Sequence, residues 1–587
     1  MKMNTFNSFR FCLKGFLSLL SLLRILTGRL TCFVPRRCVL GTTKAKLVCF
    51  LWFGVFALQA SDRYVVAPGT GGTNEGPYTS WAIAATQVQW AVDAATNAGD
   101  TVWVSNGVYV LTNQISVISN IVLRSTNGPD VTIVNGGFVA GAPDATTNNR
   151  CLYLSNSSAF VSGFTFSNGA VCAGGGGGVW MADGTLSNCT VRDNIAYSLA
   201  AVSIHGGGIY ISPRGTVTTC RVTGNITTNA TVSSSGAGAG ILGAGSAWFD
   251  IFNCLISNNT AYAKNAATYG AGIQAGKSGS VRSCMICNNT ADTVQGGGIY
   301  MNSTTTILAD STVAVNSCYS FGGCFVSRGT ITNCVISDNN YFAPSAGNIY
   351  LLNTTFIGST NKTIPAVGMN GTFAYMNIFK DCVIRDNISA GISMLGACYL
   401  SNCVVSGNQM GGVSCQDGTI RNSLIVGNTN AGNYGGLLIP ANAGTVTVGS
   451  CTIASNQSTA AGSGLRIEAT NASLLISSCV IYSNGVIGSN DVFDACAPTN
   501  YGALQYSCVG TNPGFTGAGI VVADPKFKDF AGGNFHLAGN SPCINRGSNE
   551  TWMTNAYDLD RAQRIRYGTV DMGSYERINE GVIYTVY

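Results

Sequence analysis

The stretch Cys189-Thr190-Val191-Arg192-Asp193-Asn194 decides the fold, because its pattern recurs along the chain. Eleven copies place Cys or Ser first, Val or Ile two positions later, and Asn five positions after the start. The copies begin at Cys189, Cys220, Cys254, Cys284, Ser311, Cys334, Cys382, Cys403, Ser423, Cys451 and Cys479. Their asparagines are Asn194, Asn225, Asn259, Asn289, Asn316, Asn339, Asn387, Asn408, Asn428, Asn456 and Asn484. Such self-similarity is the signature of a repeat protein.

The distance between copies varies from 20 to 34 residues, with one step of 48 between Cys334 and Cys382. A constant phrase at variable distance indicates a constant strand joined by variable loops. Residues i and i+2 of a strand face the same side, so we expect Cys and Val/Ile to face inward and the residue between them to face outward. The long step predicts one further coil around residues 348–356 that has lost the phrase.

The repeated Asn is expected at the turn that ends each strand. Asn tolerates the left-handed backbone region, and its amide can bond the backbone or the Asn of the next coil. Coils stacked at about 4.8 Å would therefore form ladders of Asn, of Cys or Ser, and of Val or Ile. Because Ser replaces Cys, the ladder thiols are predicted to fill space in the core rather than bind metal. Ten cysteines after Ala60 lie off the ladder, and their pairing stays open.

Paired glycines precede most copies, as in Gly177-Gly178-Val179-Trp180 and Gly207-Gly208-Ile209-Tyr210. Paired glycines allow a tight corner and a close approach of the backbone. Each coil is thus predicted to contain a corner, a strand, a turn, a second strand and the Asn turn. The sequence predicts an all-β protein, a single-stranded parallel β-helix (β-solenoid). Its period and composition do not fit helical repeats, propellers or collagen.

A cap is expected at the N-terminal end, where an open solenoid would expose strand edges. Thr86 and Gln89 predict a capping box and a short helix that Gly99 ends. The segment Ala98-Gly-Asp-Thr-Val-Trp-Val-Ser-Asn-Gly-Val-Tyr109 resembles the first strand of pectin-lyase-like proteins. That resemblance implies a right-handed helix with a short N-terminal capping helix.

The C-terminal segment contains Asp524-Pro-Lys-Phe527, Asn534-Phe-His-Leu537 and Ser541-Pro-Cys-Ile-Asn-Arg-Gly547. It resembles the choice-of-anchor Q domain of exported bacterial proteins, although Arg561-Ala-Gln563 replaces the turn glycine of that family. The matching residues are Asp558, Asp560, Arg564, Asp571, Gly573, Tyr575 and Glu576. No anchoring signal follows, so attachment by that route is not expected. The repeats are also similar to those of chlamydial polymorphic outer-membrane proteins.

Residues 1–60 are predicted to be a leader. Lys44 and Lys46 precede an apolar run, residues 47–58, and then Gln59-Ala60-Ser61, a pattern typical of a signal peptide. A second apolar stretch, residues 11–26, is consistent with a long leader, an anchor or a start codon assigned too early. Without the leader, 22 basic residues face 26 acidic ones, so nucleic-acid binding is not expected.

The sequence predicts four parts: the leader 1–60, an N-terminal cap with the first coils 61–135, the right-handed β-helix 136–500, and a C-terminal choice-of-anchor-like module 501–587. We expect an exported monomer, extracellular or on the outer surface, with no membrane span in the mature chain.

Candidate catalytic residues are few. Glycoside hydrolysis usually needs two facing carboxylates, and acidic residues are sparse between residues 150 and 500. Arg192-Asp193 and Arg385-Asp386 occupy the same place in two coils and are predicted to be solvated turns. We interpret His205 as a surface residue and His536 as an inward-facing packing residue. No catalytic or cofactor-binding residue is predicted. For Asp558, Asp560 and Asp571, calcium binding is the alternative to hydrogen-bonded turns.

The sequence favours a non-catalytic scaffold for adhesion or for binding a polysaccharide or cell-surface ligand. The alternatives are a polysaccharide lyase or glycoside hydrolase with an unrecognised site, and a purely structural surface-layer component. A binding scaffold predicts outward strand positions rich in aromatic and polar residues, without clustered carboxylates. An enzyme predicts carboxylates or a Lys/Arg pair that converge from neighbouring coils.

Overall fold

The structure is a computed structural model. It describes residues 59–139, 149–199, 203–229, 236–263, 268–276, 278–292, 295–318, 323–340, 342–344, 348–360, 365–369, 377–432, 434–459, 462–470, 473–485, 491–494, 503–512 and 514–578. The predicted leader therefore lies outside the described residues, except for Gln59 and Ala60. In the described part of the chain, every helix is too short or too polar to cross a membrane.

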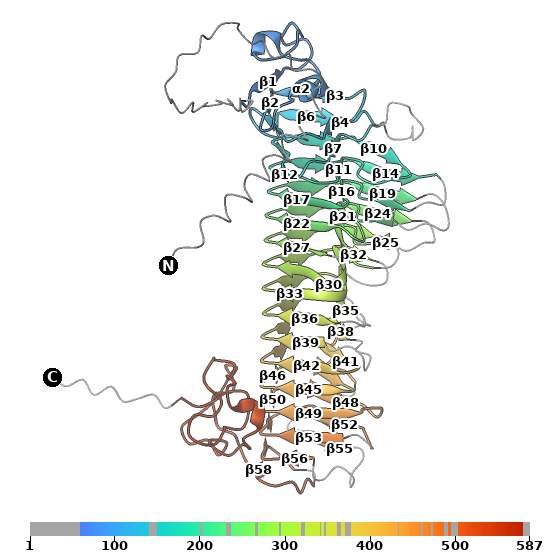
Figure 1. Cartoon of the computed structure of the whole chain (residues 1–587). Helices are drawn as coiled ribbons and strands as arrows, with labels where there is room; N and C mark the ends of the chain where they lie inside the picture. The colour runs from blue at the N-terminus through green and yellow to red at the C-terminus, as the bar shows by residue number, and fades with distance from the viewer. Residues whose placement is uncertain are drawn as a thin grey trace, which may run out of the picture. The chain divides into compact units, whose positions relative to one another are not determined.

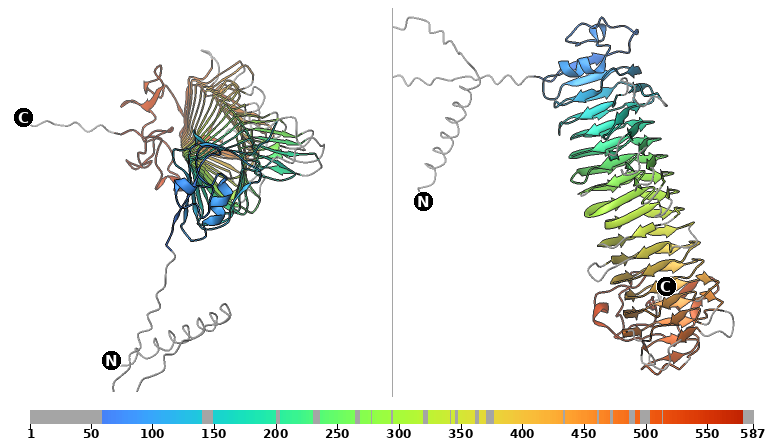
Figure 2. Two further views of the ribbon diagram at one scale, coloured as in Figure 1. Left: turned by 90° about the horizontal axis from the view of Figure 1, so that it is seen from above. Right: turned by 90° about the vertical axis from the view of Figure 1, so that its right-hand side faces the viewer.

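The repeated unit is a coil of three short strands, each of which pairs in parallel with the equivalent strand of the next coil (Figure 1). One coil contains β11 (Val179–Met181), β12 (Thr185–Ser187) and β13 (Thr190–Arg192). They pair with β16 (Ile209–Ile211), β17 (Arg214–Thr218) and β18 (Arg221–Thr223) of the following coil. Viewed along the stack, the coils superpose and outline three faces (Figure 2).

The three faces run through the described coils. The first face extends from β4 (Ile115–Val117) to β55 (Val492–Asp494), the second from β1 (Asp62–Val65) to β56 (Leu504–Gln505), and the third from β3 (Gly107–Val110) to β58 (Val521–Val522). Their inward side chains form one continuous apolar core that includes Val179, Leu186 and Val191. Alternation along each short strand thus separates a buried inner position from a solvent-facing outer one.

The Cys/Ser position of the phrase is buried, and its side chains form hydrogen bonds within a coil and between coils. The Cys220 Sγ donates to the Thr218 carbonyl at 3.2 Å, and the Cys220 backbone N–H donates to the Cys254 Sγ at 3.4 Å. Ser311 bonds in the same way, donating to the Ala309 carbonyl at 2.6 Å and accepting from the Cys284 N–H at 3.0 Å. Ser therefore replaces Cys in hydrogen bonding as well as in volume.

The Asn of the phrase is buried, and it is not the residue with left-handed backbone geometry. That geometry belongs to the preceding residue, such as Asp193 with φ 57° and Asn258 with φ 55°, so the predicted backbone role of Asn is wrong. The Asn side chain instead bonds along the stack: Asn194 Nδ2 donates to Asn225 Oδ1 at 2.9 Å. We call this column of amides the Asn ladder.

The extra coil predicted around residues 348–356 is confirmed. It contains β36 (Ile349–Leu352) and β37 (Thr355–Ile357), which stack in register with their neighbours. Thr354 occupies the Cys position, and its hydroxyl donates to the Leu352 carbonyl at 2.9 Å. Ser359 replaces the ladder Asn, so the phrase is lost while the strands remain.

A flange projects from several coils between the third and the first face (Figure 1). Its outgoing sheet contains β10 (Ala170–Cys172), β14 (Ile195–Ser198), β19 (Ile226–Asn229), β24 (Thr260–Ala263), β29 (Thr290–Ala291) and β32 (Ser317–Cys318). Its returning sheet contains β15 (Ile204–His205), β20 (Gly236–Ala237) and β25 (Thr268–Tyr269). Small side chains such as Ala261 and Ala271 pack in the flange. These segments were predicted from the sequence to be loops, and that prediction is wrong for the flange strands.

The glycine pairs form the corner where the returning flange strand joins the first face. A Cβ on Gly208 would lie 2.7 Å from the Gly240 carbonyl oxygen and 2.9 Å from the Asn225 amide. No side chain fits there, because the corner backbone of one coil lies against the next corner and the Asn ladder.

The N-terminal end is closed by the short helix α2 (Val88–Ala94), which buries Val88, Ala91 and Val92. The predicted capping box is wrong: the N-cap residue is Gln87, which makes no side-chain cap bond. The Gln89 side chain instead donates to Asp93 at 2.7 Å and accepts from the Ser116 N–H at 2.7 Å. Bonding to the first coil thus replaces the local cap.

The single strand expected over residues 100–109 is in fact two strands, β2 (Thr101–Val104) on the second face and β3 on the third. Gly107 makes the bend between them with φ 149°, and a Cβ there would lie 2.4 Å from the Ala67 Cβ. The prediction of one strand was wrong. Val102 and Val104 are buried before the bend, whereas after it Tyr109 is buried and Val108 is exposed, so the alternation shifts by one residue.

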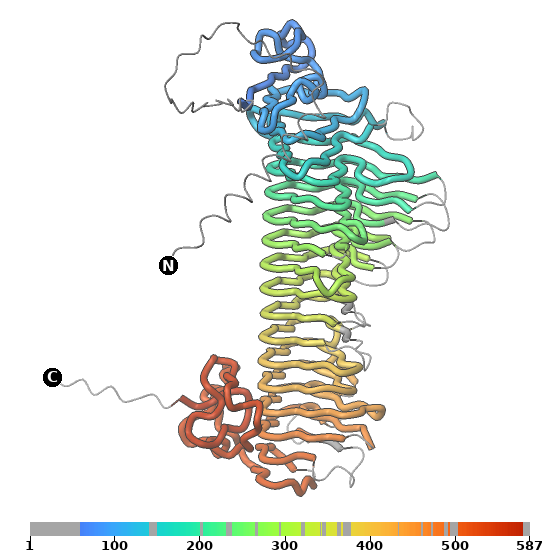
Figure 3. Tube along the Cα trace, in the orientation of Figure 1, coloured from blue at the N-terminus to red at the C-terminus, as the bar shows by residue number. Residues whose placement is uncertain are grey.

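The C-terminal module folds back along the outer side of the third face (Figure 3). Coil pairing continues through β57 (Cys508–Val509) and β58 before the module begins. The module contains the antiparallel strands β59 (Phe527–Asp529) and β60 (Asn534–Leu537) and the 3-10 helix η2 (Thr551–Met553). Its Ser574 N–H donates to the Thr452 hydroxyl at 3.0 Å, and its Gly573 N–H donates to the Ser478 carbonyl at 2.7 Å.

Candidate functional site

The outer positions of the first face carry aromatic residues on consecutive coils. Tyr153 of β7 (Leu152–Leu154), Trp180 of β11 and Tyr210 of β16 are in register. Their ring centroids are 5.2 Å apart for Tyr153 and Trp180 and 5.9 Å apart for Trp180 and Tyr210. All three rings are partly exposed, while the strand residues on either side of each ring point into the core.

A second aromatic group continues the same column of outward positions. Tyr300 of β30 (Ile299–Ala309) and Phe325 of β33 (Cys324–Thr332) stack with centroids 5.3 Å apart and planes 7° from parallel. Tyr269 from the flange lies 5.0 Å from Tyr300. Leu242 and Gln274 occupy the positions between the two groups. We call the register column Tyr153, Trp180, Tyr210, Leu242, Gln274, Tyr300 and Phe325 the aromatic ladder.

Arg150 fixes the N-terminal part of the aromatic ladder. Its guanidinium lies 5.0 Å from the centroid of the Trp180 ring and donates to the Gly175 and Gly176 carbonyls, each at 2.9 Å. Burial lowers the pKa of Arg150, but a guanidinium stays charged at any pH of interest. The cation over the ring face and its bonds to the flange corner hold Trp180 in one orientation.

His205 at the end of β15 stacks on Tyr210, with centroids 6.1 Å apart and planes 15° from parallel. Burial lowers the pKa of His205, so the ring is neutral at pH 7. In the described structure, its Nδ1 and the Gln274 Oε1 are buried polar atoms without a hydrogen-bond partner. The predicted surface residue is therefore part of the flange beside the aromatic ladder, which corrects the interpretation of His205.

None of the aromatic-ladder positions is acidic. Arg192 and Asp193 pair with each other at 2.6 Å, and Arg385 and Asp386 pair at 2.5 Å, in coils far apart along the stack. All four side chains are about half exposed, so each pair is a solvated turn that contributes little binding energy. Among the described residues, no group of three or more His, Cys, Asp or Glu side chains is arranged to hold a metal ion.

The acidic residues of the C-terminal module bond its own backbone. Asp558 accepts from the N–H groups of Ala562 at 2.7 Å and Glu576 at 2.7 Å. Asp571 accepts from Asn545 at 2.6 Å and Arg577 at 2.7 Å. These bonds close the turns of the module.

A buried contact between Arg564 and Glu576 joins the same turns. Arg564 is fully buried, pairs with Glu576 at 3.2 Å and donates to the Gly573 carbonyl at 3.0 Å. Burial raises the pKa values of Asp558 and Asp571, and it raises the pKa of Glu576 to about 8. Three buried carboxyl groups thus surround one guanidinium.

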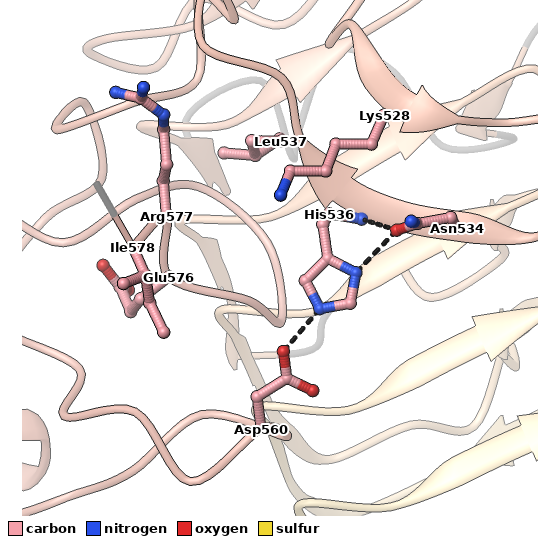
Figure 4. A pocket seen from close by; sticks show the side chains of 8 residues that line it. All are labelled: Lys528, Asn534, His536, Leu537, Asp560, Glu576, Arg577 and Ile578. Atoms are coloured by element: carbon pink, nitrogen blue, oxygen red, sulfur yellow. Dashed lines mark hydrogen bonds and ion pairs between the residues drawn. The ribbon is translucent and has the colours of Figure 1, made fainter. Parts of the chain in front are cut away.

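His536 faces a surface cavity rather than the interior, so the predicted inward position is wrong. In β60 the alternate residues Phe535 and Leu537 are buried, which turns His536 outward. Its ring nitrogens lie 2.5 Å from Asp560 Oδ2 and 2.6 Å from Asn534 Oδ1 (Figure 4). The cavity has a volume of about 350 Å³. Strict alternation from Phe535 would have predicted this orientation.

Tyr575 of the module lies beside this cavity. Its ring centroid is 4.0 Å from that of His536, and burial raises its pKa to about 12. Its contact with the imidazole supports the ring that Asp560 and Asn534 hold. The matching residues of the C-terminal module thus form one bonded unit against the last coils.

Part of the chain matches a family of known β-helix proteins. A family model described as "Right handed beta helix region" matches residues 365–527. The chain is similar to the structure titled "Crystal structure of pectate lyase Pel9A", with 12% identity, 89% of this chain and 97% of that chain covered, and a TM-score of 0.22. It is also similar to the structure titled "The complex structure of XylC with xylose", with 9% identity. That match covers 89% of this chain and 99% of the other chain, with a TM-score of 0.21. No curated protein matches the chain. The family match and the three parallel faces together show that the chain is a right-handed parallel β-helix.

Proposed function

We propose that the protein is an exported, non-catalytic scaffold that binds a polysaccharide on its first face. The observation that carries this proposal is the register of Tyr153, Trp180 and Tyr210 on consecutive coils. Pyranose rings have apolar faces that pack on aromatic rings, and carbohydrate chains repeat at ring-to-ring intervals. A column of rings spaced 5.2 and 5.9 Å apart offers successive contacts to such a chain.

The rigidity of the aromatic ladder supports binding. Each ring stands on a strand that is hydrogen-bonded to both neighbouring coils, and Arg150 holds Trp180 from one side. Rings that are already ordered lose little conformational freedom when a ligand binds, so more of the contact energy remains as affinity.

The polar atoms beside the rings favour a ligand rich in hydroxyl groups. His205 Nδ1 and Gln274 Oε1 have no hydrogen-bond partner in the described structure. Rotation of either side chain toward the exposed side of the aromatic ladder would bring a polar atom to a ligand hydroxyl. A few directed polar groups on an apolar surface are typical of specific ligand sites.

Export completes the proposal. It is supported by the signal-like pattern of residues 44–61 and by the resemblance of residues 524–576 to a domain of exported bacterial proteins. Mass analysis of secreted protein should find Ser61 at its N-terminus. Secreted protein that retains the preceding residues would contradict cleavage at Ala60.

The binding test uses purified mature protein and affinity electrophoresis through gels that contain neutral or uronate polysaccharides. We expect at least one polysaccharide to retard the protein, and Trp180→Ala to weaken that binding about tenfold, roughly 1.4 kcal/mol. Trp180→Phe should retain part of the affinity. Tyr350→Ala is the matched control, because Tyr350 is an outward residue of the second face that is 41% exposed.

Two outcomes would overturn this function. Equal retardation of wild type and Trp180→Ala would remove the aromatic ladder from binding. Release of unsaturated uronates or reducing ends by the wild type would show that the protein is a lyase or hydrolase instead.

A further inference from the structure

Two cysteines meet where the C-terminal module contacts the last coils. Cys508 begins β57, whose pairing places it beside Val480 on the third face. Cys543 belongs to the Ser541-Pro542-Cys543 segment of the module. Both side chains are fully buried, and both pack in one apolar cluster with Val480 and Met572.

Cys508 is not part of the Cys/Ser column. The inward position of this coil is occupied by Ser507, whose hydroxyl accepts from the Cys479 N–H at 3.0 Å. The next residue along a strand points to the opposite side, so Cys508 faces outward, toward the module. Its burial therefore comes from the module, and the thiol would face solvent in a chain whose module had not yet docked.

The two cysteines pack in the same apolar cluster between β57 and the module. The neighbouring Cys543 thiol and burial both raise the pKa of Cys508. The Cys508 Sγ also lies 3.4 Å from the Ala523 carbonyl oxygen. A disulfide requires two cysteines whose side chains approach closely, and these two pack in one buried cluster.

The cysteines of the Cys/Ser column, which belong to the repeated motif, differ from this pair. Cys479 is enclosed within its coil, and its Sγ donates to the Ser477 carbonyl at 3.2 Å. Ser311 and Ser423 occupy the same position in other coils and bond in the same way, so the column functions without sulfur chemistry. A thiol pair that lies between the last coils and the C-terminal module has a role that Ser cannot take.

We propose that Cys508 and Cys543 form a disulfide in the exported protein and that this bond fastens the C-terminal module to the β-helix. The oxidant is a small-molecule or protein disulfide of an oxidising compartment. The Cys508 thiolate attacks that disulfide, which forms a mixed disulfide and releases one thiol. The Cys543 thiolate then attacks the Cys508 sulfur, which forms the protein disulfide and releases the second thiol. Two electrons and two protons pass from the cysteine pair to the oxidant.

The bond would stabilise docking by restricting the unfolded chain. It closes a loop with 34 residues between the two cysteines. For loops of this length, the chain-entropy model lowers the unfolding constant by roughly a hundred- to a thousandfold. The module would then stay in place under conditions in which its apolar contacts and hydrogen bonds alone would let it dissociate.

The test equilibrates the full mature chain in glutathione buffers of increasing oxidised fraction. Samples are quenched in acid, alkylated in denaturant, digested and analysed by mass spectrometry. We expect a cross-linked peptide that contains Cys508 and Cys543, while Cys451 and Cys479 carry the alkyl group. The denaturation midpoint of the module should fall when the oxidised protein is reduced.

Three variants make the result specific. Cys508→Ser and Cys543→Ser should each abolish the cross-linked peptide and the dependence of the midpoint on reduction. Cys451→Ser is the matched control, because Ser occupies the same position in other coils, and it should keep both effects. Complete alkylation of Cys508 and Cys543 at every buffer ratio, or cross-links to other cysteines only, would overturn the proposal. Because no carbohydrate is involved, this result is independent of the proposed binding function.

Discussion

At the scale of the residue, the β-helix keeps a buried Asn in every typical coil because each amide is completely bonded. Asn225 Nδ2 donates to the Val191 carbonyl at 2.9 Å and to Asn259 Oδ1 at 3.0 Å. Its Oδ1 accepts from the backbone N–H and from the Nδ2 of Asn194, at 3.1 and 2.9 Å. Burying an amide whose hydrogen bonds are all made costs little stability. Removing one amide leaves its neighbours in the column without hydrogen-bond partners.

Asn259→Ala should therefore destabilise the protein strongly. The substitution leaves the Asn225 backbone N–H and one Asn225 amide hydrogen without acceptors in a buried site. We expect a loss of about 2–4 kcal/mol, measured by guanidinium denaturation. Asn120→Ala, at an exposed position, should change the midpoint little. Equal midpoints for Asn259→Ala and wild type would contradict the energetic role of the Asn ladder.

Glu576 predicts a pH dependence of the C-terminal module. Burial raises the pKa of its carboxyl from 4.5 to about 8, although Arg564 beside it acts to lower the pKa. The folded module therefore binds this proton more tightly than the unfolded chain does. The resulting stability is fully present below pH 4.5 and is lost as the pH rises toward about 8.

This dependence is measured by thermal unfolding of wild type and Glu576→Gln between pH 5 and pH 8. The neutral amide cannot ionise, so the variant should lose part of the decrease in midpoint that wild type shows at the higher pH. Asp130→Asn, at an exposed position in the N-terminal coils, should behave as wild type. Identical pH profiles for wild type and Glu576→Gln would contradict the assignment.

At the scale of the element, the flange and its glycine corner determine what lies beside the aromatic ladder. The outgoing and returning strands bring His205 onto Tyr210 and Tyr269 onto Tyr300. The corner that makes this possible has no room for a side chain at Gly208. The elements that shape the candidate site are thus insertions between the third and first faces, supported by the repeated core.

Gly208→Ala should disrupt this corner. The added methyl group would meet the Gly240 carbonyl at 2.7 Å and the Asn225 amide at 2.9 Å, both of which belong to the packed stack. We expect a destabilisation of about 1–3 kcal/mol in denaturant titration. Gly245→Ala is the matched control, since a methyl group added there would have nothing within 4 Å. A loss of stability as large for Gly245→Ala as for Gly208→Ala would contradict the steric explanation.

At the scale of the whole molecule, the inward positions that repeat in each coil were predicted from the sequence, whereas the outward positions and the flange were not. The inward Cys and Val/Ile positions and the Asn recur in every typical coil, so the fold could be derived from their spacing. The aromatic ladder uses outward positions, whose residue type varies between coils. The signal that could have found it is the aromatic residue two positions after several glycine pairs, such as Trp180 and Tyr210, which the structure places in register.

Local rules also failed where tertiary bonds replaced them. Thr86 and Gln89 match a capping box, but Gln89 bonds to the Ser116 backbone of the first coil instead. His536 was predicted to pack inward, although its neighbours Phe535 and Leu537 occupy the buried side of β60. The flange could not be distinguished from loops, since its short strands are stabilised by the equivalent strands of neighbouring coils.

Binding of a carbohydrate chain along consecutive coils of the first face can be measured by calorimetric titration with oligosaccharides of increasing length. The oligosaccharides come from the polysaccharide that retards the wild-type protein. Affinity should rise with chain length as successive units reach Tyr153, Trp180 and Tyr210, and Trp180→Ala should flatten that rise while Tyr350→Ala leaves it intact. An affinity that does not depend on chain length, or that rises equally in Trp180→Ala and wild type, would contradict the account.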